Sequence, residues 1–117
     1  MKESGILTTI CQYLQYLENQ GKLIYQRNNS GAFINPKGNF YRMGKRGMGD
    51  IIIWLPDGKS MILEVKNETG KLSLSQLEME LKLKQLNHLY FIVRSLEEVE
   101  NIFKKLKNQQ LLKPYRV

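Results

Sequence analysis

Cysteine and histidine are almost absent from this sequence, which holds 1 of each among its 117 residues, Cys11 and His88. A single cysteine cannot close a disulfide within the chain, and one Cys with one His cannot supply the ligands of a structural zinc site. The same scarcity argues against a Cys–His nucleophile and base, and so against covalent acyl chemistry. We expect Cys11 to pack in the core and His88 to lie at a helix end or on the surface.

Long hydrophobic runs are also missing. No apolar stretch approaches the roughly 20 residues that a membrane-spanning helix needs, and Met1–Gly5 opens no signal-peptide hydrophobic region. With 42% hydrophobic and 25% charged residues, the composition is that of an ordinary soluble globular protein. We therefore expect one domain over residues 1–117, located in the cytoplasm and without a membrane partner.

Acidic residues are in deficit. The sequence has 11 Asp and Glu against 18 Lys and Arg, which gives a formal net charge of +7. Such a balance favours a polyanion or an acidic surface as partner. Many basic proteins bind no nucleic acid, so the charge supports such a partner without establishing it.

The most informative stretch that is present runs over residues 49–66. Two runs of β-branched and large apolar residues flank the tripeptide Pro56-Asp57-Gly58. Proline presets the backbone φ angle of a turn and glycine accepts the positive φ of its corner, so the stretch predicts a β-hairpin.

The register of this hairpin decides where its charged side chains lie. With a three-residue turn, Leu55 pairs with Lys59, and Asp50 stands directly opposite Glu64 with the Cβ atoms roughly 5 Å apart. Lys66 then follows one step along the same face. A four-residue turn would send Asp50 to the other face, so the register is an assumption of this prediction.

Two facing carboxylates on apolar strands repel each other and are costly when partly buried, unless a cation neutralises them. Strain of this kind, in a sequence that otherwise follows its local rules, is expected at a functional site. Oxygen ligands at this spacing suit Mg²⁺ or Mn²⁺. The alternative is a hairpin that shows scattered charges to solvent and holds no site.

Hydrophobic spacing and helix signals predict the other elements. We expect a helix over residues 4–20, a strand over 23–27, a helix from Ser73 to about His88, a strand over 89–93 and a last helix from Ser95. Ser73 and Gln76 form a capping box, and a leucine row is expected to bury the second helix, with members Leu74, Leu77, Leu81 and Leu86. The order predicts an α/β fold in which a mixed sheet is flanked by helices.

Residues 31–49 are predicted to form a loop with five glycines and four basic residues. Glycine lets the backbone approach a ligand closely, basic side chains neutralise phosphates, and Phe40 or Tyr41 can stack on bases. Because the loop runs directly into Asp50, we expect it to contact nucleic acid rather than remain a solvated loop. The candidate contacts are Lys45 and Arg46 above all, with Arg42, Lys37 and Arg27.

The pattern Gly49-Asp50, a spacer and then Glu64-Val65-Lys66 resembles the core of the restriction-endonuclease-like, PD-(D/E)XK, nuclease superfamily. More narrowly, the segments GMGDII, LPDGK, LEVK and GKLSLSQ are similar to the VRR-NUC domain, the viral replication and repair nuclease module. Its small stand-alone form occurs in bacteriophages and prophages. The resemblance covers roughly Glu3 to Phe103 and implies an αβββαβ core, here followed by a C-terminal helix. Asp with Glu-x-Lys alone is weak, and the added motifs make the resemblance specific.

The resemblance also implies roles for residues. Asp50, Glu64 and the backbone carbonyl of Val65 would bind one or two Mg²⁺ or Mn²⁺ ions. Lys66 would orient the attacking water, and Gln76 would lie beside that lysine and water, although its capping box is already a complete structural reason for a glutamine there.

A further acid is expected at the start of the first helix. Relatives commonly carry a glutamate there, and Glu3 is the candidate metal ligand. The match is imperfect, because Gly5 stands where relatives often have the acid.

These features predict a metal-dependent endonuclease that hydrolyses DNA phosphodiester bonds. The resemblance implies selectivity for branched DNA, of the Holliday junction resolvase kind, and a homodimer, for which Tyr13, Tyr16 and Trp54 could supply an interface. The alternative is a non-catalytic basic nucleic-acid-binding module with the same fold.

Overall fold

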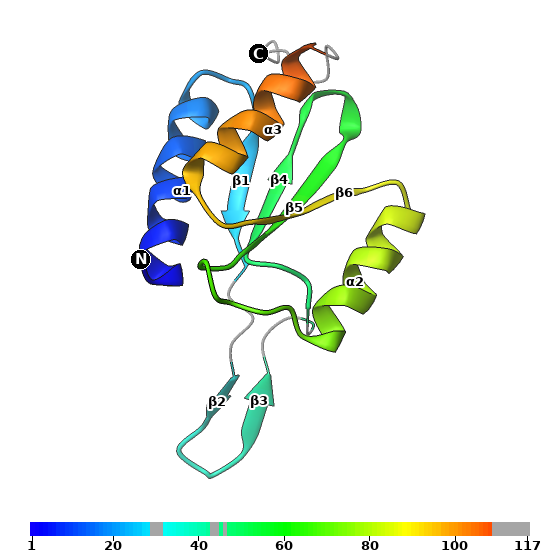
Figure 1. Ribbon diagram of the computed structural model, residues 1–117. Coiled ribbons are helices and arrows are strands. Elements are labelled where there is room, and N and C mark those ends of the chain that lie inside the picture. The colour runs from blue at the N-terminus through cyan, green and yellow to red at the C-terminus, as the bar shows by residue number, and fades with distance from the viewer. Residues whose placement is uncertain (29–31, 43–44, 46, 109–117) are drawn as a thin grey trace.

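The computed structural model describes residues 1–28, 32–42, 45 and 47–108. Three α-helices, six strands and one 3₁₀ turn make up this part of the chain. In order they are α1 (Glu3–Asn19), β1 (Ile24–Arg27), β2 (Ala32–Ile34), β3 (Phe40–Arg42), β4 (Ile51–Trp54), the 3₁₀ turn (Pro56–Gly58), β5 (Ser60–Val65), α2 (Leu74–Gln85), β6 (Leu89–Val93) and α3 (Leu96–Asn108) (Figure 1).

A four-stranded mixed sheet in the order β1-β4-β5-β6 forms the centre of the molecule. β4 pairs antiparallel with both β1 and β5, whereas β6 runs parallel to β5. α1 and α3 lie together on one side of the sheet, and α2 lies at the β6 end (Figure 1). The expected α/β architecture, a mixed sheet flanked by helices with a C-terminal helix added, is confirmed.

Side-chain alternation explains which face of the sheet carries the main core. Ile51 and Ile53 on β4, and Met61, Leu63 and Val65 on β5, all point to the α1–α3 side and are buried. The residues between them point to the other face.

The hairpin has the predicted register. The Leu55 N–H donates to the Lys59 carbonyl at 2.7 Å, and Ile51 lies opposite Leu63. The corner uses two left-handed residues, because Asp57 as well as Gly58 has a positive φ, 66° and 78°. The three-residue turn therefore holds, and the four-residue alternative does not.

The predicted loop over residues 31–49 needs a correction. It contains the hairpin β2–β3, in which Ala32 pairs with Arg42 and Ile34 with Phe40. The rings of Phe33 and Tyr41 stack on it with centroids 5.4 Å apart. We call residues 32–42 the arm, because they project beyond the end of the sheet (Figure 1).

The predicted burial of the leucine row on α2 is wrong. Leu74, Leu77, Leu81 and Leu86 are 72%, 47%, 61% and 69% exposed, and α2 has no buried residue. The side toward the sheet carries the half-buried Met79 and Leu83 instead. Periodicity found an apolar side of the helix, but two sides carry apolar residues and the sheet takes the other one.

The two scarce residues have ordinary surroundings. Cys11 is half-buried and packs against the core, as expected, and burial raises the pKa of its thiol. His88 follows α2, but it is half-buried and its Nδ1 is hydrogen-bonded to the Ser60 hydroxyl of β5. Within the described ranges, no helix is long and apolar enough to cross a bilayer.

Candidate active site

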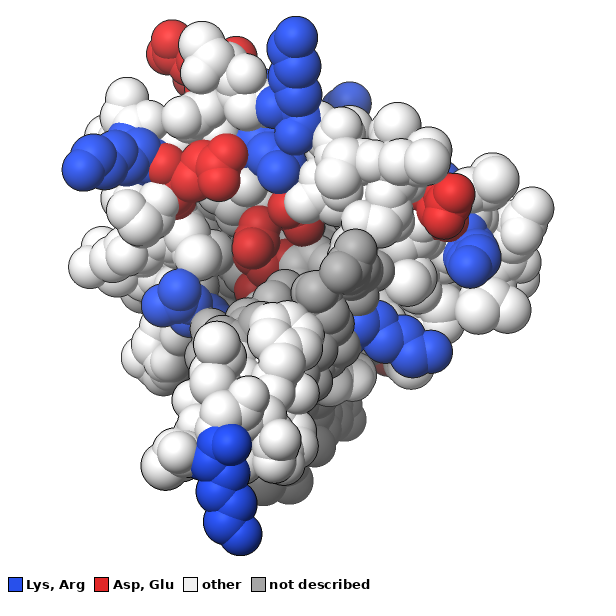
Figure 2. Space-filling model, turned by 90° about the horizontal axis from the view of Figure 1, so that it is seen from below, with Lys and Arg blue, Asp and Glu red and all other residues white. Residues whose placement is uncertain are grey.

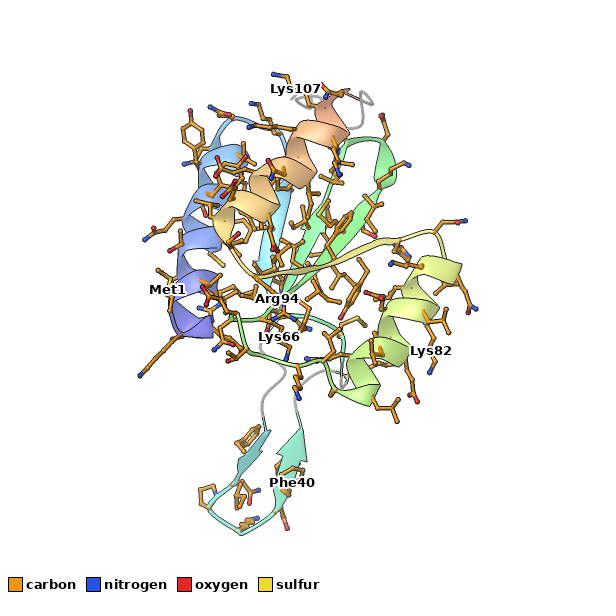
Figure 3. The ribbon with its side chains drawn as sticks, in the orientation of Figure 1. Met1, Phe40, Lys66, Lys82, Arg94 and Lys107 are labelled. Carbon is orange, nitrogen blue, oxygen red and sulfur yellow. The ribbon has the colours of Figure 1, made fainter. Side chains whose placement is uncertain are left out.

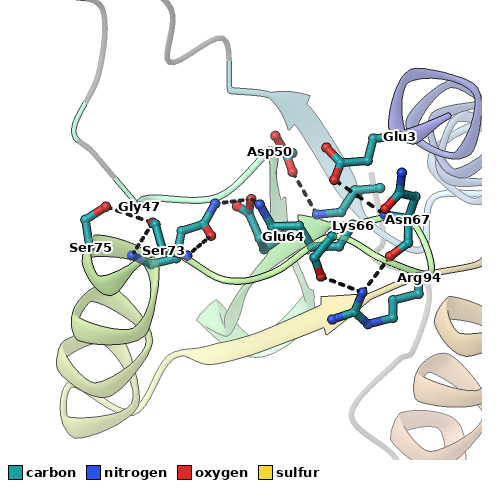
Figure 4. Close-up of polar contacts among 12 residues, drawn as sticks. Glu3, Gly47, Asp50, Glu64, Lys66, Asn67, Ser73, Ser75 and Arg94 are labelled. Atoms are coloured by element: carbon teal, nitrogen blue, oxygen red, sulfur yellow. Dashed lines mark hydrogen bonds and ion pairs between the residues drawn. The ribbon is translucent and has the colours of Figure 1, made fainter.

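Asp50 stands at the entry to β4, where three backbone or side-chain bonds fix it. Its N–H donates to the Leu63 carbonyl at 2.9 Å, and its own carbonyl accepts from the Asn28 N–H at 2.8 Å. Its Oδ2 accepts from the Val65 N–H at 2.7 Å. The carboxylate is thereby drawn across the end of β5, next to Glu64 (Figure 4).

Glu64 is the one charged side chain buried within the described residues, with 5% of its surface exposed. It lies on β5, on the sheet face opposite the main core. The Gln76 Nε2 donates to its Oε1 at 2.5 Å, and the Lys66 Nζ lies 3.6 Å from the same oxygen. The structure therefore brings Asp50, Glu64, Lys66 and Gln76 together.

Lys66 follows β5 directly, and its backbone is anchored by an N–H bond to the Val93 carbonyl at 3.0 Å. Its side chain is largely buried, with 14% exposed, and points toward the end of the sheet from which the arm projects (Figure 3). An ammonium group held in this way compensates part of the charge of the two carboxylates.

Gln76 closes the predicted capping box and also contacts the acidic pair. Its Oε1 accepts from the Ser73 N–H at 2.8 Å, which closes the predicted capping box at the start of α2. Its Nε2 is left to donate to Glu64 (Figure 4). One amide thus fixes the end of the helix to the acidic pair.

Glu3 lies close to this group without joining it. Its Oε1 is 3.5 Å from the Asn67 N–H, and its charge raises the pKa of both Asp50 and Glu64. Among the residues that the structure describes, no three Asp, Glu, His or Cys side chains form a ready-made metal cluster. Glu3 therefore lies beside the carboxylate pair, and its carboxylate contacts the Asn67 backbone (Figure 4).

The electrostatics of the pair follow from its burial. Burial first, then repulsion from Asp50, raises the pKa of Glu64 from 4.5 to about 7, against the opposing charge of Lys66. Burial likewise raises the pKa of Asp50, although the Val65 N–H and Lys66 oppose the shift. The two carboxylates share one ammonium group, that of Lys66, so when both are ionised the positive charge at this site does not balance the negative charge.

Two glycines shape the loop that delivers Asp50. Gly47 has a φ of 74°, and a Cβ there would stand 2.3 Å from the Ser75 carbonyl oxygen on α2. Gly49 has a φ of 106°, and its Cβ would meet the Ile62 side chain at 2.3 Å. The close approach that glycine was expected to permit is thus to the protein's own α2 and β5.

Arg94 is a residue that the motif analysis missed. Its Nη1 donates to the carbonyls of Asn67 and Gly70 at 2.5 and 2.9 Å, and so closes the loop that follows Lys66 (Figure 4). The parallel register, in which Val65 lies opposite Val93, puts Arg94 beside Lys66. The parallel register is what shows that Arg94 lies near Lys66. It could not be inferred from the sequence, because the pairing of β6 with β5 was not known.

The candidate nucleic-acid contacts are placed unevenly. Lys37 is exposed near the tip of the arm, Lys45 is exposed on the return from it, and Arg27 is exposed at the end of β1. Arg46 lies outside the described residues, as does the side chain of Arg42.

Viewed from below, acidic side chains lie in a hollow with basic ones around it (Figure 2).

The donor set at this corner fits a hard divalent cation. Two carboxylates with raised pKa values, one of them 5% exposed, form an oxygen-rich site in which a cation would relieve repulsion. Mg²⁺ usually takes one or two protein carboxylates and keeps several waters, so a third acidic ligand is not required.

A solved structure described as a VRR_NUC domain has the same fold. It superposes with a TM-score of 0.61 at 19% sequence identity, over 89% of this chain and 97% of that chain. No protein-family model matches the sequence, and no curated protein matches it. The likeness establishes the restriction-endonuclease-like fold that the motifs predicted.

Proposed function

We propose that this protein is a Mg²⁺- or Mn²⁺-dependent endonuclease that hydrolyses phosphodiester bonds in DNA. The observation that carries the proposal is the meeting of Asp50, Glu64, Lys66 and Gln76 at one end of the sheet, around a carboxylate that is 5% exposed. A fold shared with a VRR_NUC domain and a net charge of +7 agree with it.

Asp50, Glu64 and the Val65 carbonyl would hold the cation, with Glu3 as a further candidate reached through water. When bound, such an ion lowers the pKa of a water, polarises the phosphoryl oxygen and stabilises the leaving alkoxide. Lys66 would orient that water and balance the negative charge that grows on the phosphate. Gln76 would fix Glu64 and leave the lysine free to act.

The test uses Asp50→Asn and Lys66→Ala with labelled linear duplex, flap and four-way junction DNA, in Mn²⁺ or in EDTA. We expect Mn²⁺-dependent cleavage by the wild type and a loss of about 10³-fold or more in both variants, with unchanged circular dichroism. Lys66→Ala should still bind Mn²⁺ in calorimetry, whereas Asp50→Asn should not. Full activity in either variant would reject the assignment.

The finer proposal is that the substrate is a branched duplex and that the enzyme acts as a homodimer. One domain of this size offers one candidate site, and a four-way junction needs two strands cut symmetrically. A preference for junction over linear duplex in the same assay supports it, and equal rates on both contradict it.

The competing function is a basic module that binds nucleic acid without chemistry. Such a module gains nothing from a half-buried Asp50 beside a buried Glu64, because the repulsion between the two carboxylates costs stability. It would retain DNA in a salt-dependent manner and yield no product with Mg²⁺ or Mn²⁺ over time.

A further inference from the structure

The loop over residues 67–70, which follows Lys66, borders the candidate active site. The Asn67 N–H lies 3.5 Å from the Glu3 Oε1. A Cβ added to Gly70 would stand 2.8 Å from the same Glu3 oxygen and 3.3 Å from the Lys66 Cδ. The loop therefore packs against the aliphatic stem of Lys66 and against the Glu3 carboxylate, so its position limits where both charged groups can lie.

Bonds within the loop fold it into a turn. The Asn67 Oδ1 accepts from the Thr69 N–H at 3.2 Å and from the Thr69 hydroxyl at 3.3 Å, and the Gly70 N–H donates to the Asn67 carbonyl at 3.3 Å. These bonds shape the turn, but they join loop residues only to one another. A contact from outside the loop is needed to hold the turn in place beside Lys66.

Arg94 supplies such a contact. Its Nη1 donates to the carbonyls of Asn67 and Gly70, the first and last residues of the turn, at 2.5 and 2.9 Å (Figure 4). Arg94 is itself held, because it follows β6 directly and its backbone N–H donates to the Glu98 Oε2 on α3 at 2.7 Å. One charged donor thus attaches the turn to the point where β6 passes into α3, and hydrogen bonds from a charged group are the stronger kind.

The two side chains that the loop packs against are those that act on the acidic pair. The charge of Lys66 lowers the pKa of both Asp50 and Glu64, and the charge of Glu3 raises it. Lys66 also contacts Glu64 directly, at 3.6 Å. Whatever holds the loop therefore also holds the surroundings of the two carboxylates.

We propose that Arg94 is a positioning residue of the active site. By holding the carbonyls of Asn67 and Gly70, it keeps the loop against Lys66 and so keeps the ammonium group directed at Glu64. The inference rests on the proposed function, in which Lys66 orients the attacking water. Because Arg94 acts through the loop and not on the substrate, its loss should slow the chemical step and leave DNA binding unchanged.

The kinetic test uses Arg94→Met, which keeps an apolar stem and removes the donors. We expect the kcat of Mn²⁺-dependent cleavage to fall roughly 30-fold, with KM within about twofold of the wild-type value. Arg94→Lys should recover most of this loss, because one nitrogen makes both bonds and an ammonium group can also donate to two carbonyls. An equal loss in the two variants would contradict the assignment to these bonds.

Ser95→Ala is the control for a merely structural role at the start of α3. The Ser95 Oγ accepts from the Glu98 N–H at 3.2 Å, so the variant weakens the beginning of this helix and leaves the Arg94 donors in place. We expect a lower denaturation midpoint and an unchanged kcat. A fall in kcat equal to that of Arg94→Met would make the effect a general result of weakening α3, and would overturn the proposal.

A direct contact between Arg94 and DNA would give a different result. Arg94→Met would then raise KM and lower the slope of log affinity against log salt concentration by about 0.9. Fluorescence anisotropy in an Asp50→Asn background measures this slope without cleavage. A lowered slope would overturn the positioning role, and an unchanged slope supports it.

Backbone NMR relaxation tests the inference without DNA or metal, and so separately from the proposed function. In EDTA, we expect the amide order parameters of Asn67 and Gly70 to fall from about 0.85 to below about 0.6 in Arg94→Met, with that of Val65 unchanged. Unchanged values at Asn67 and Gly70 would overturn the proposal. If the loop is released in this variant but the wild type cleaves no DNA, the nuclease function is wrong and the hold of Arg94 on the loop stands.

Discussion

The neighbours of Glu64 stabilise its negative charge only in part. The Lys66 ammonium and the Gln76 amide both contact its Oε1, yet burial and repulsion from Asp50 still raise the pKa of Glu64 to about 7. A purely structural position would be expected to select a neutral residue here, because burying an ion that is not fully paired costs stability. The retained acid therefore fits a site that a cation completes.

The first prediction concerns the pH dependence of stability. Because the folded pKa of Glu64 lies above its unfolded value of 4.5, the folded state binds the proton more tightly, and the metal-free protein loses stability as pH rises from about 4.5 to about 7. We expect a loss on the order of 2 kcal/mol between pH 5 and 7.5 in EDTA, measured by urea unfolding at each pH.

Glu64→Gln is the matched variant, since it keeps the oxygen that accepts from Gln76. It should flatten this pH dependence and should remove most of the stabilisation that Mg²⁺ gives the wild type at pH 7.5. An equal slope in variant and wild type would show that another group carries the effect.

For single residues, the sequence predicted positions correctly where they follow from the geometry of neighbouring strands. Alternation and a three-residue turn were enough to place Asp50 opposite Glu64, because both follow from local backbone rules. Arg94 and Asn28 escaped notice, because each acts through a partner distant in sequence: Arg94 holds Asn67, and Asn28 donates to the Gly49 carbonyl at 3.1 Å. Such contacts depend on tertiary pairing that no local pattern contains.

Among the elements, the loop that leads into Asp50 is held by contact with α2 and β5. Gly47 and Gly49 both lie where a side chain has no room, against the Ser75 carbonyl and the Ile62 side chain. Since the Asp50 backbone follows directly, a displacement here moves the carboxylate as well as the loop.

The second prediction is that Gly47→Ala and Gly49→Ala destabilise the protein by about 2 kcal/mol more than Gly38→Ala does. Gly38 is the control because it shares a positive φ, 84°, but has nothing within 4 Å of the place of a Cβ. Chemical denaturation of the three variants measures the difference. Equal losses would mean that only the left-handed backbone is costly and that the close packing is not.

The third prediction assigns a phosphate contact to the arm. Lys37→Ala should lower the slope of log affinity against log salt concentration by about 0.9, because one fewer counterion is released from DNA. Lys107, exposed at the opposite end of the molecule (Figure 3), is the control, and Lys107→Ala should leave the slope unchanged. Fluorescence anisotropy with Asp50→Asn as the common background avoids cleavage. Equal slopes for both lysine variants would exclude Lys37 from the DNA contact.

The sequence predicted all three helices and the four strands of the sheet to within a few residues, because caps, turns and periodicity are local. It did not predict the arm, whose strands Ala32–Ile34 and Phe40–Arg42 are three residues long and lie in a glycine-rich segment. Nor could it orient α2. A helix with apolar residues on two sides is turned by what packs on it, and here the sheet takes the side that carries Met79 and Leu83.

For the whole molecule, the proposed dimer has a consequence for the chemistry. A two-fold axis relates two Asp50–Glu64 pairs, each of which would cut one strand of a junction. Resolution of a junction into linear products then requires both sites, whereas removal of a flap requires one.

The last prediction tests this division with dimers that carry one Asp50→Asn chain and one intact chain, purified through two different tags. Such dimers should nick a four-way junction once and accumulate the nicked species, because the second strand lies at the inactive site. On a flap substrate the same dimers should retain roughly half of the wild-type rate, since one productive orientation remains of two related by symmetry. Full resolution by the mixed dimers would mean that one site cuts both strands. The dimer could then exist without symmetric cleavage by its two sites.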